Sequence, residues 1–284
     1  MKKRFYKISG VIGIVTLICA FTSTKLVFQN GNRVDSGLCE ITNDAFEDGE
    51  QLTYKALYSL PPMRVGAGEA VFKAKDEGDT YHFTLDGKTY KSYEWFYKVR
   101  DRYESRVDKE SMLPILSIRD IKEGGYNRYE ENTYDRDSLK VISNRGKSKN
   151  NLKLREFDLN EKCIHDVLSI IYAVRNLDHS TMKENDIFNI DVFLSKSEYD
   201  LDVRFMGREE DKKIPGLGRF NTLLYSPEVI EGDVFKEKNA MRVWVTDDEN
   251  RIPLMVQTPL SLGSVKVILK DYKNLKHPLT SEVD

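Results

Sequence analysis

The stretch Tyr93–Asp108, "YEWFYKVRDRYESRVD", mixes aromatic and charged side chains in an alternating order. At a period of two residues, its apolar side chains fall on one face and most of its charges fall on the other. A helical period would instead place arginines within the apolar stripe, and aromatic and β-branched residues favour a pleated surface. The stretch therefore predicts one long strand, Trp95–Val107.

The two faces of this predicted strand differ in chemistry. The charged face carries Arg100 and the alternate residues that follow it. Asp101 and Ser105 interrupt the opposite face, so Asp101 points inward unless a bulge turns it outward. The other members of that face are apolar: Trp95, Tyr97, Val99, Tyr103 and Val107.

A second Arg-Asp pair, Arg119-Asp120, follows after the turn predicted at residues 108–114. A hairpin with residue 107 opposite residue 115 places Arg102 opposite Asp120 and Glu104 near Arg119. Each such cross-strand charge pair contributes about 0.2–1 kcal/mol.

Two interpretations of these charges remain open. One is a solvated sheet face held by salt bridges. The other is a polar groove around a ligand, since arginine and aromatic side chains together suit anionic or carbohydrate-like ligands. The groove would gather Arg100, Asp101, Arg119, Asp120, Arg128 and Glu130 with Trp95 and Tyr103.

Short runs rich in Tyr, Val, Phe and Leu, separated by turn residues, continue on both sides and predict an antiparallel sheet. Residues 144–161 are polar and predict an exposed loop. The run at 162–177 has apolar residues at helical spacing and predicts one helix packed on the concave side of the sheet. The other predicted strands are 51–60, 66–75, 80–90, 115–121, 126–134, 139–143, 187–194, 199–206, 219–225, 241–246, 252–258 and 264–272.

The N-terminus has basic residues followed by an apolar run of 13 residues, from Ile8 to Ala20. This predicts a secretory signal peptide over residues 1–24 and a polar arm over 25–46, before a single β-rich domain over 47–284. The run is shorter than the roughly 20 residues of a spanning helix. A membrane anchor is the weaker alternative, and Ile18 before Cys19 disfavours lipidation. We expect no transmembrane segment in the mature chain.

The net charge and the cysteines indicate which partners and which compartment to expect. Without residues 1–24 the chain has 40 basic and 46 acidic residues, a formal charge of −6, which argues against nucleic acid as a partner. Cys39 and Cys163 would then remain as an even pair, consistent with a disulfide in an exported protein. Two free buried thiols are the alternative, and a reactive thiol at Cys163 beside His165 is disfavoured because residues two apart do not face each other on a helix.

Common catalytic and metal-binding motifs are missing. The four histidines lack zinc-ligand spacing, and the sequence has neither a G-x-S-x-G motif nor a glycine-rich phosphate loop. The segment 247–250, "DDEN", predicts a hairpin turn rather than a calcium loop. We therefore predict no metal and no cofactor.

Several stretches together resemble the exported bacterial family called domain of unknown function 3108. They include "AFEDGEQLTYKALYS", "RVGAGEAVF", "KTYKSYEWFYKVRDRYESRVD", "LPILSIRDIKEGGYNRYEENTYD", "CIHDVLSIIYAVRN" and "VWVTDDENRIPLMVQTPLSLGSVKVIL". The likeness runs from about Ala45 to Leu269, and the ending Lys276–Ser281 resembles Bacteroidetes-type members. The segment Ser59–Met63 departs from the expected regular hairpin.

The resemblance implies a β-rich envelope protein with no assigned activity. It also implies a fold similar to periplasmic lipoprotein carriers, in which a half-barrel holds acyl chains against a helical lid; this is an analogy of fold alone. The fold expected is thus a strongly curved antiparallel sheet or half-barrel with one packed helix, located in the periplasm or on the periplasmic side of the outer membrane.

The favoured function is non-enzymatic: binding of an apolar or amphipathic envelope ligand, or an accessory role in envelope assembly. The expected partners are a lipid, a glycan or an envelope protein. The ligand would lie between sheet and helix, although this space could equally be filled core. The alternative is a carbohydrate-binding protein or enzyme that uses the cluster around Arg100-Asp101. The favoured site, between sheet and helix, would be lined by Trp95, Tyr97, Tyr103, Ile171 and Val174.

Overall fold

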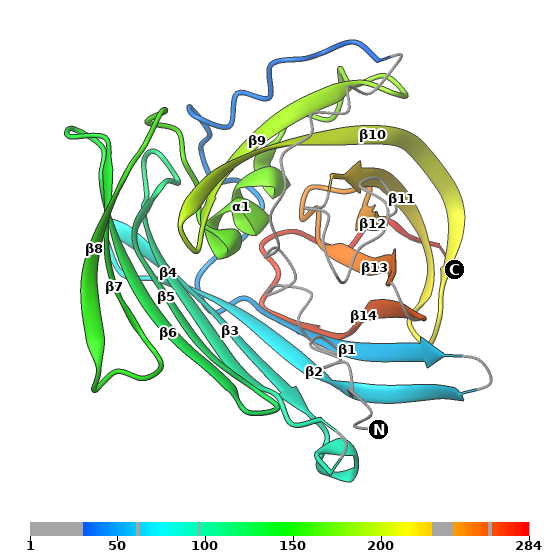
Figure 1. Cartoon of the computed structure of the whole chain (residues 1–284). Coiled ribbons are helices and arrows are strands. Elements are labelled where there is room, and N and C mark those ends of the chain that lie inside the picture. Colours follow the sequence, from blue (N-terminus) through cyan, green and yellow to red (C-terminus); the bar gives the residue numbers. More distant parts are fainter. Residues whose placement is uncertain (1–30, 61–62, 96, 229–240, 261–262, 284) are drawn as a thin grey trace.

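The computed structural model describes residues 31–60, 63–95, 97–228, 241–260 and 263–283. The predicted signal peptide, with Cys19, lies outside the described residues. Within them, one antiparallel sheet contains every strand, and its order is β8-β7-β6-β5-β4-β3-β2-β1-β14-β13-β12-β11-β10-β9, with β15 paired to β11. The sheet curves around the helix α1 (Val167–Ala173), which lies inside the curve (Figure 1).

The strands of the first half follow the chain as a meander. They are β1 (Gln51–Leu60), β2 (Met63–Asp76), β3 (Thr80–Thr89), β4 (Arg100–Asp108), β5 (Pro114–Glu123), β6 (Tyr126–Asp135), β7 (Lys140–Gly146) and β8 (Leu152–Asp158). The strands of the second half are β9 (Ile187–Leu194), β10 (Ser197–Ile214), β11 (Gly218–Pro227), β12 (Arg242–Thr246), β13 (Pro253–Pro259), β14 (Ser264–Lys273) and β15 (Glu282–Val283). The predicted curved antiparallel sheet with one packed helix is confirmed.

The two ends of the described sheet meet through side chains. Phe193 on β9 packs against Phe157 on β8, with ring centroids 5.6 Å apart, and against Tyr134 on β6, at 6.3 Å. The side chain of Glu198 accepts hydrogen bonds from the backbone and side chain of Asn160. The turn between β9 and β10 is thereby placed against the inner face of β5, β6 and β7.

The helix is shorter than the predicted segment 162–177. Asp166 is its N-cap and accepts hydrogen bonds from the backbone N–H groups of Leu168 and Ser169, while Ser169 closes a capping box. The preceding His165 pairs its backbone with β9 as an isolated parallel bridge to Val192. Tertiary pairing thus overrides the helical periodicity before Asp166, and a 3₁₀ turn, η2 (Val174–Asn176), ends the segment.

The space between α1 and β3 is filled. The ring of Tyr172 stacks on Phe83 with centroids 3.8 Å apart, and Phe46 from the N-terminal arm meets both rings edge-on. Aromatic residues of this size dominate the burial that holds such an interface. Of the two alternatives for this space, the packed core is the one present.

Three strand predictions need correction. The predicted strand 95–107 begins only at Arg100, because the chain from Lys91 to Tyr93 forms a 3₁₀ turn, η1. The predicted loop 144–161 contains β8, an edge strand whose side chains are mostly exposed, so that no alternation marks it. The strand predicted at 199–206 extends over 18 residues as β10.

The N-terminal arm is tied into the domain at several points. Cys39 and Cys163 form a disulfide, as predicted. Arg33 forms an isolated parallel bridge with Ile187 on β9, and Leu38 is buried in the main core. The described part of the arm is therefore integral to the packed structure.

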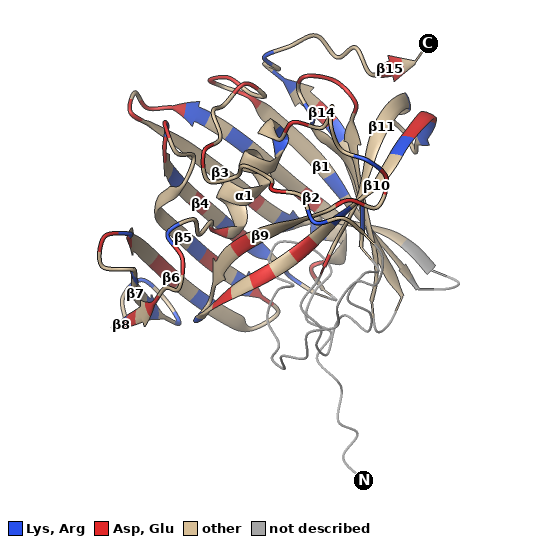
Figure 2. Ribbon diagram, turned by 90° about the horizontal axis from the view of Figure 1, so that it is seen from above, with Lys and Arg blue, Asp and Glu red and all other residues tan. Residues whose placement is uncertain are grey.

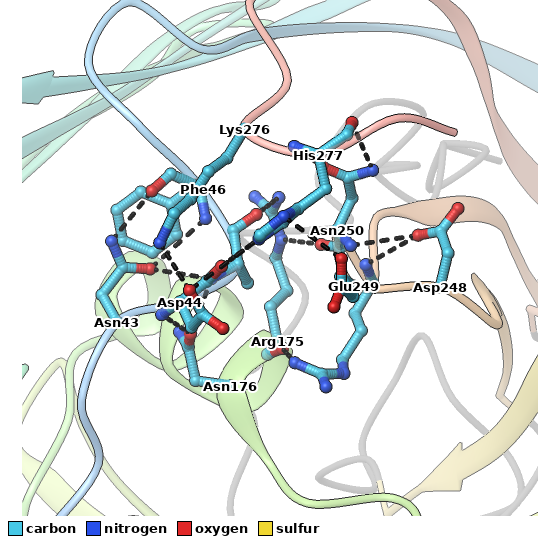
Figure 3. Close-up of polar contacts among 12 residues, drawn as sticks. Asn43, Asp44, Phe46, Arg175, Asn176, Asp248, Glu249, Asn250, Lys276 and His277 are labelled. Carbon is cyan, nitrogen blue, oxygen red and sulfur yellow. Dashed lines mark hydrogen bonds and ion pairs between the residues drawn. The ribbon is translucent and has the colours of Figure 1, made fainter. Parts of the chain in front are cut away.

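A polar junction joins the arm, the end of the helical segment, the β12–β13 turn and the C-terminal segment (Figure 3). At its centre Arg175 forms two hydrogen bonds with the carboxylate of Glu50, at 2.6 and 2.7 Å, and both side chains are buried. Asp248 in the predicted hairpin turn accepts a hydrogen bond from the hydroxyl of Ser281. Lys276 in the C-terminal segment donates a hydrogen bond of 2.6 Å to Asp44 in the arm, so the junction connects segments more than 200 residues apart in the sequence.

Candidate functional site

The predicted faces of the opening stretch are confirmed within β4. Asp101, Tyr103, Ser105 and Val107 are buried on the inner face of the sheet. Bands of basic and acidic residues cross the neighbouring ribbons of this part of the sheet (Figure 2). The outer face carries the alternate charged residues Arg100, Arg102, Glu104, Arg106 and Asp108.

The outer face of β4 is held by salt bridges, which is the simpler of the two interpretations. Arg102 lies opposite Asp120 in the register, as predicted, but its guanidinium pairs with Asp86 and Glu104. Asp120 pairs with Lys122 instead. The expected approach of Glu104 to Arg119 is wrong, because these side chains lie on opposite faces of the sheet.

The predicted polar groove is only partly assembled. Arg100 lies on the outer-face positions and pairs with Glu94, and Asp120 also faces outward. Trp95 lies in the connection before β4 with 82% of its surface exposed. Five of the predicted residues share the inner face: Asp101, Tyr103, Arg119, Arg128 and Glu130.

Tyr97 also lies before β4 rather than on it. Its ring covers Gly124 in the β5–β6 turn, where an added Cβ would lie 2.5 Å from the ring. Gly124 has a φ of +55°, so this position requires glycine both for its backbone and for its space. Trp95 and Tyr97 thus belong to the rim of the sheet and not to the space beneath the helix.

Asp101 is the inward acid that the sequence singles out. Its carboxylate accepts a hydrogen bond of 2.9 Å from the backbone N–H of Lys122, and its nearest charged neighbour is the carboxyl of Glu123. Burial, with the charge of Glu123 beside it, raises the pKa of Asp101 to about 8, against the smaller opposing effect of Arg119. The raised pKa favours the protonated form of Asp101, which shares a hydrogen bond with Glu123.

This raised pKa predicts a pH dependence of stability. The folded protein holds the Asp101 proton up to about pH 8, whereas the unfolded chain releases it near 3.8, so the stability that this group contributes is fully present below pH 4 and is lost as pH rises to about 8. We expect Asp101→Asn to remove this slope. The free energy of unfolding of the variant, relative to wild type, should be higher at pH 8 than at pH 4 by on the order of a few kcal/mol. Urea unfolding from pH 4 to 9 measures it; parallel curves for the two proteins would contradict it.

Beyond Asp101, the inner face carries a row of side chains across four strands. Tyr103, Arg119, Glu130 and Arg145 lie directly opposite one another in the registers of β4 to β7. Glu130 is fully buried and accepts hydrogen bonds from Arg119 at 3.0 Å, from Arg128 at 2.7 Å and from Arg145. We call Arg119, Arg128 and Arg145, with Glu130 between them, the arginine cluster.

The β9–β10 turn closes over the arginine cluster. Arg119 donates to the hydroxyl of Ser195 at 3.2 Å, and Arg145 donates to the carbonyl of Ser195. Ser195 has a φ of +59°, a left-handed conformation that is uncommon without glycine. The two arginine contacts hold this turn in place.

A small cavity of about 10 Å³ lies between the turn, the inner face and the start of α1, which is room for about one water. Its polar wall includes Arg119, Asn132 and Asp166, and its apolar wall includes Leu168 and Phe193. The carboxylate of Asp166 already has partners. It caps the N-terminus of α1, and it accepts a hydrogen bond of 2.5 Å from the hydroxyl of Ser105. The site thus combines basic, amide and apolar groups at one place.

Sequence reasoning missed Arg145, Ser195 and Phe193 as parts of this site. Arg145 follows the alternation of Val141 and Ser143, so extending the predicted strand 139–143 by two residues would have placed it on the inner face. No comparable pattern in the sequence predicts that the β9–β10 turn lies against the inner face. This placement depends on tertiary contacts between residues 50 or more positions apart.

The described residues contain neither a metal-binding cluster nor a membrane-spanning helix. No group of three or more His, Cys, Asp or Glu side chains within them could hold a metal ion. Within the same part of the chain, no helix has the length and apolarity needed to cross a membrane.

Comparison with known proteins places the chain in a family. No curated protein matches the sequence significantly. A solved structure, titled "Crystal Structure of Beta-barrel-like Protein of Domain of Unknown Function DUF1849 from Brucella abortus", is similar with a TM-score of 0.54 and 7% identity, over 81% of this chain and 99% of that one. This likeness concerns the fold alone. The family model described as Protein of unknown function (DUF3108) matches residues 52–270, and the chain therefore belongs to this family.

Proposed function

We propose that the protein is an exported envelope protein that binds an amphipathic ligand without converting it. The ligand site is the space between the inner face of β5–β7 and the β9–β10 turn, rather than the packed space under α1. The observation that carries the proposal is the arginine cluster, in which three guanidinium groups on an inner sheet face share one carboxylate. Such a face suits the polar end of a ligand better than it suits a core.

The apolar part of the ligand would contact the other wall of the cavity. Val167 and Leu168 from α1 and Phe193 from β9 line this wall beside Arg119. Ligand sites commonly combine mostly apolar walls with a few placed polar groups. The cavity holds about one water as packed, so the β9–β10 turn must move outward to admit a ligand.

An exported location is part of the proposal. The basic and apolar N-terminal residues support it, and so does the disulfide between Cys39 and Cys163, because disulfides persist in oxidising compartments. Fractionation of the native host, with detection of the processed chain, tests the location independently of binding.

Native mass spectrometry tests the binding proposal. Protein purified without denaturation from its own envelope should carry a bound species of lipid or glycolipid mass, and this species should be lost on unfolding. A chain observed only at its own mass, which also retains no amphiphile added to the purified protein, would contradict the proposal. An unrelated exported protein purified in parallel controls for carry-over of membrane lipid.

A second candidate is a carbohydrate-binding or carbohydrate-cleaving function at Asp101 and Glu123. The pair supports it because a carboxylic acid that stays protonated at neutral pH can act as a general acid. Trp95 and Tyr126, exposed at 82% and 57%, could stack on sugar rings at the same rim. Turnover or binding of soluble envelope glycans that is lost in Asp101→Asn would favour this candidate; activity unchanged in that variant would exclude it.

A further inference from the structure

The charges of the arginine cluster do not balance. Arg119, Arg128 and Arg145 carry three positive charges and Glu130 one negative charge, so the excess is 3 − 1 = 2. The nearby carboxyls have other partners: Asp101 is bonded to the backbone of Lys122, and Asp166 caps α1 and is bonded to Ser105. Buried charges are costly unless they are paired, so such an excess on an inner face calls for another anion.

The hydrogen bonds of the cluster also leave capacity for a ligand. Among the described residues, Nε of Arg145 and Oδ1 of Asn132 are buried without a hydrogen-bond partner, and the two residues are only 6% and 2% exposed. Two of the acceptors that the cluster does have, the carbonyl and hydroxyl of Ser195, are neutral. Hydrogen bonds from a guanidinium to a charged acceptor are roughly twice as strong as neutral ones.

Further basic side chains lie near the cluster. Arg128 keeps 29% of its side chain exposed, so it connects the buried arginines to solvent. Lys153 on β8 lies opposite Arg145 in the register and is exposed, and Lys196 is exposed in the turn beside Ser195. Side chains directly opposite in an antiparallel pair share a face, so Lys153 adds a basic group to the inner face beside Arg145.

We propose that the arginine cluster binds an anionic oxygen group, a phosphate or carboxylate, and that this group is the headgroup of the amphipathic ligand. The headgroup would take the place of Ser195 as acceptor for Arg119 and Arg145, with Arg128 as its solvent-side partner. The identification of the anion as a headgroup rests on the proposed function; the anion site itself stands on the charge excess and the unused donor. Forked donors on arginine suit both oxygen groups.

Isothermal titration calorimetry with three probes tests the inference on the full exported chain. Dihexanoyl phosphatidylglycerol and dihexanoyl phosphatidylcholine have the same acyl chains and differ in net charge, and inorganic phosphate has the charge without chains. We expect the phosphatidylglycerol to bind at least roughly tenfold more tightly than the phosphatidylcholine, the gain expected from one charge-assisted contact. Raising the salt concentration should reduce this preference.

Matched variants assign the preference to the cluster. Arg128→Gln removes a partly exposed guanidinium and should abolish the charge preference, and Arg128→Lys should restore part of it because the charge returns without the fork. Arg102→Gln makes the same change of charge on the outer face of β4 and should leave the preference unchanged. Circular dichroism and urea unfolding confirm that each variant is folded.

The outcomes separate the two proposals. If both lipids bind equally and Arg128→Gln changes neither, the anion site is overturned while amphiphile binding stands. If inorganic phosphate binds as tightly as the anionic lipid and is lost in Arg128→Gln, the anion site stands and the amphipathic ligand is contradicted. If wild type binds none of the probes, the anion site is overturned.

Discussion

Replacement of Arg175 by alanine is expected to lower the free energy of unfolding by roughly 3–5 kcal/mol, because it leaves the Glu50 carboxylate buried without its partner. Arg175 is 2% exposed and Glu50 is 0% exposed. The guanidinium also donates to the backbone carbonyls of Ala45 and Asn250, each at 3.0 Å. One side chain therefore holds the arm, the helical segment and the β12–β13 turn together (Figure 3).

The chain offers a control with the same geometry. Arg219 forms two hydrogen bonds with the carboxylate of Asp211, and the two side chains are 49% and 52% exposed. Arg219→Ala should therefore cost much less stability than Arg175→Ala. Urea unfolding measures both variants. Equal losses for Arg219→Ala and Arg175→Ala would contradict the account of burial, and a double change of Arg175→Met with Glu50→Gln should recover part of the loss.

Removal of the disulfide should have an effect of similar size. Cys39 and Cys163 are 124 residues apart, and closing a loop on the order of 100 residues restricts the unfolded chain by up to about 5 kcal/mol. We expect the double variant Cys39→Ser, Cys163→Ser to lose roughly 2–5 kcal/mol in urea unfolding. The arm should lose its protection from proteolysis first, because Cys39 anchors it.

A reductant supplies the control for this prediction. Reduction of wild type should bring its unfolding midpoint to that of the double serine variant, and the variant itself should not respond. An equal midpoint for oxidised wild type and the variant would show that the bridge contributes nothing to stability. Both single serine variants should resemble the double variant, because each lacks the bridge.

The sequence predicted the part of the fold that period-two alternation specifies. The inward position of Asp101 and the register of Arg102 opposite Asp120 follow from alternation and from the place of the turn, and both are confirmed. The strand prediction was wrong at Trp95. Aromatic residues favour a strand by composition, but composition does not show whether a neighbouring strand is available for pairing. Val99 forms only an isolated bridge with Glu123, and regular pairing of β4 with β3 starts at Arg100.

Two other errors have physical causes that the sequence does not display. The edge strand β8 is exposed on both faces over most of its length, so its hydrogen bonds with β7 rather than its side chains determine it. The start of the helix at Asp166 is set by the pairing of His165 with β9, which is distant in sequence. Both features come from backbone pairing in the assembled sheet.

The candidate site was predictable only where it depends on the alternation of residues along single strands. Arg119 and Arg128 were placed on the correct strands, and alternation puts them on the inner face together with Glu130. The contact of Arg145 with Ser195 required the β9–β10 turn to fold back over the sheet. No local pattern encodes that approach, which is why the sequence pointed to Arg100, whereas the arginines of the inner face gather around Glu130.

Hydrogen–deuterium exchange tests the central claim, that a ligand binds between the inner face of β5–β7 and the β9–β10 turn. Saturation with dihexanoyl phosphatidylglycerol should slow exchange in peptides that cover residues 117–132, 143–146 and 193–198. Peptides that cover the outer rim around Trp95 should not change. Protection confined to that rim, or binding without protection at the β9–β10 turn, would contradict the account.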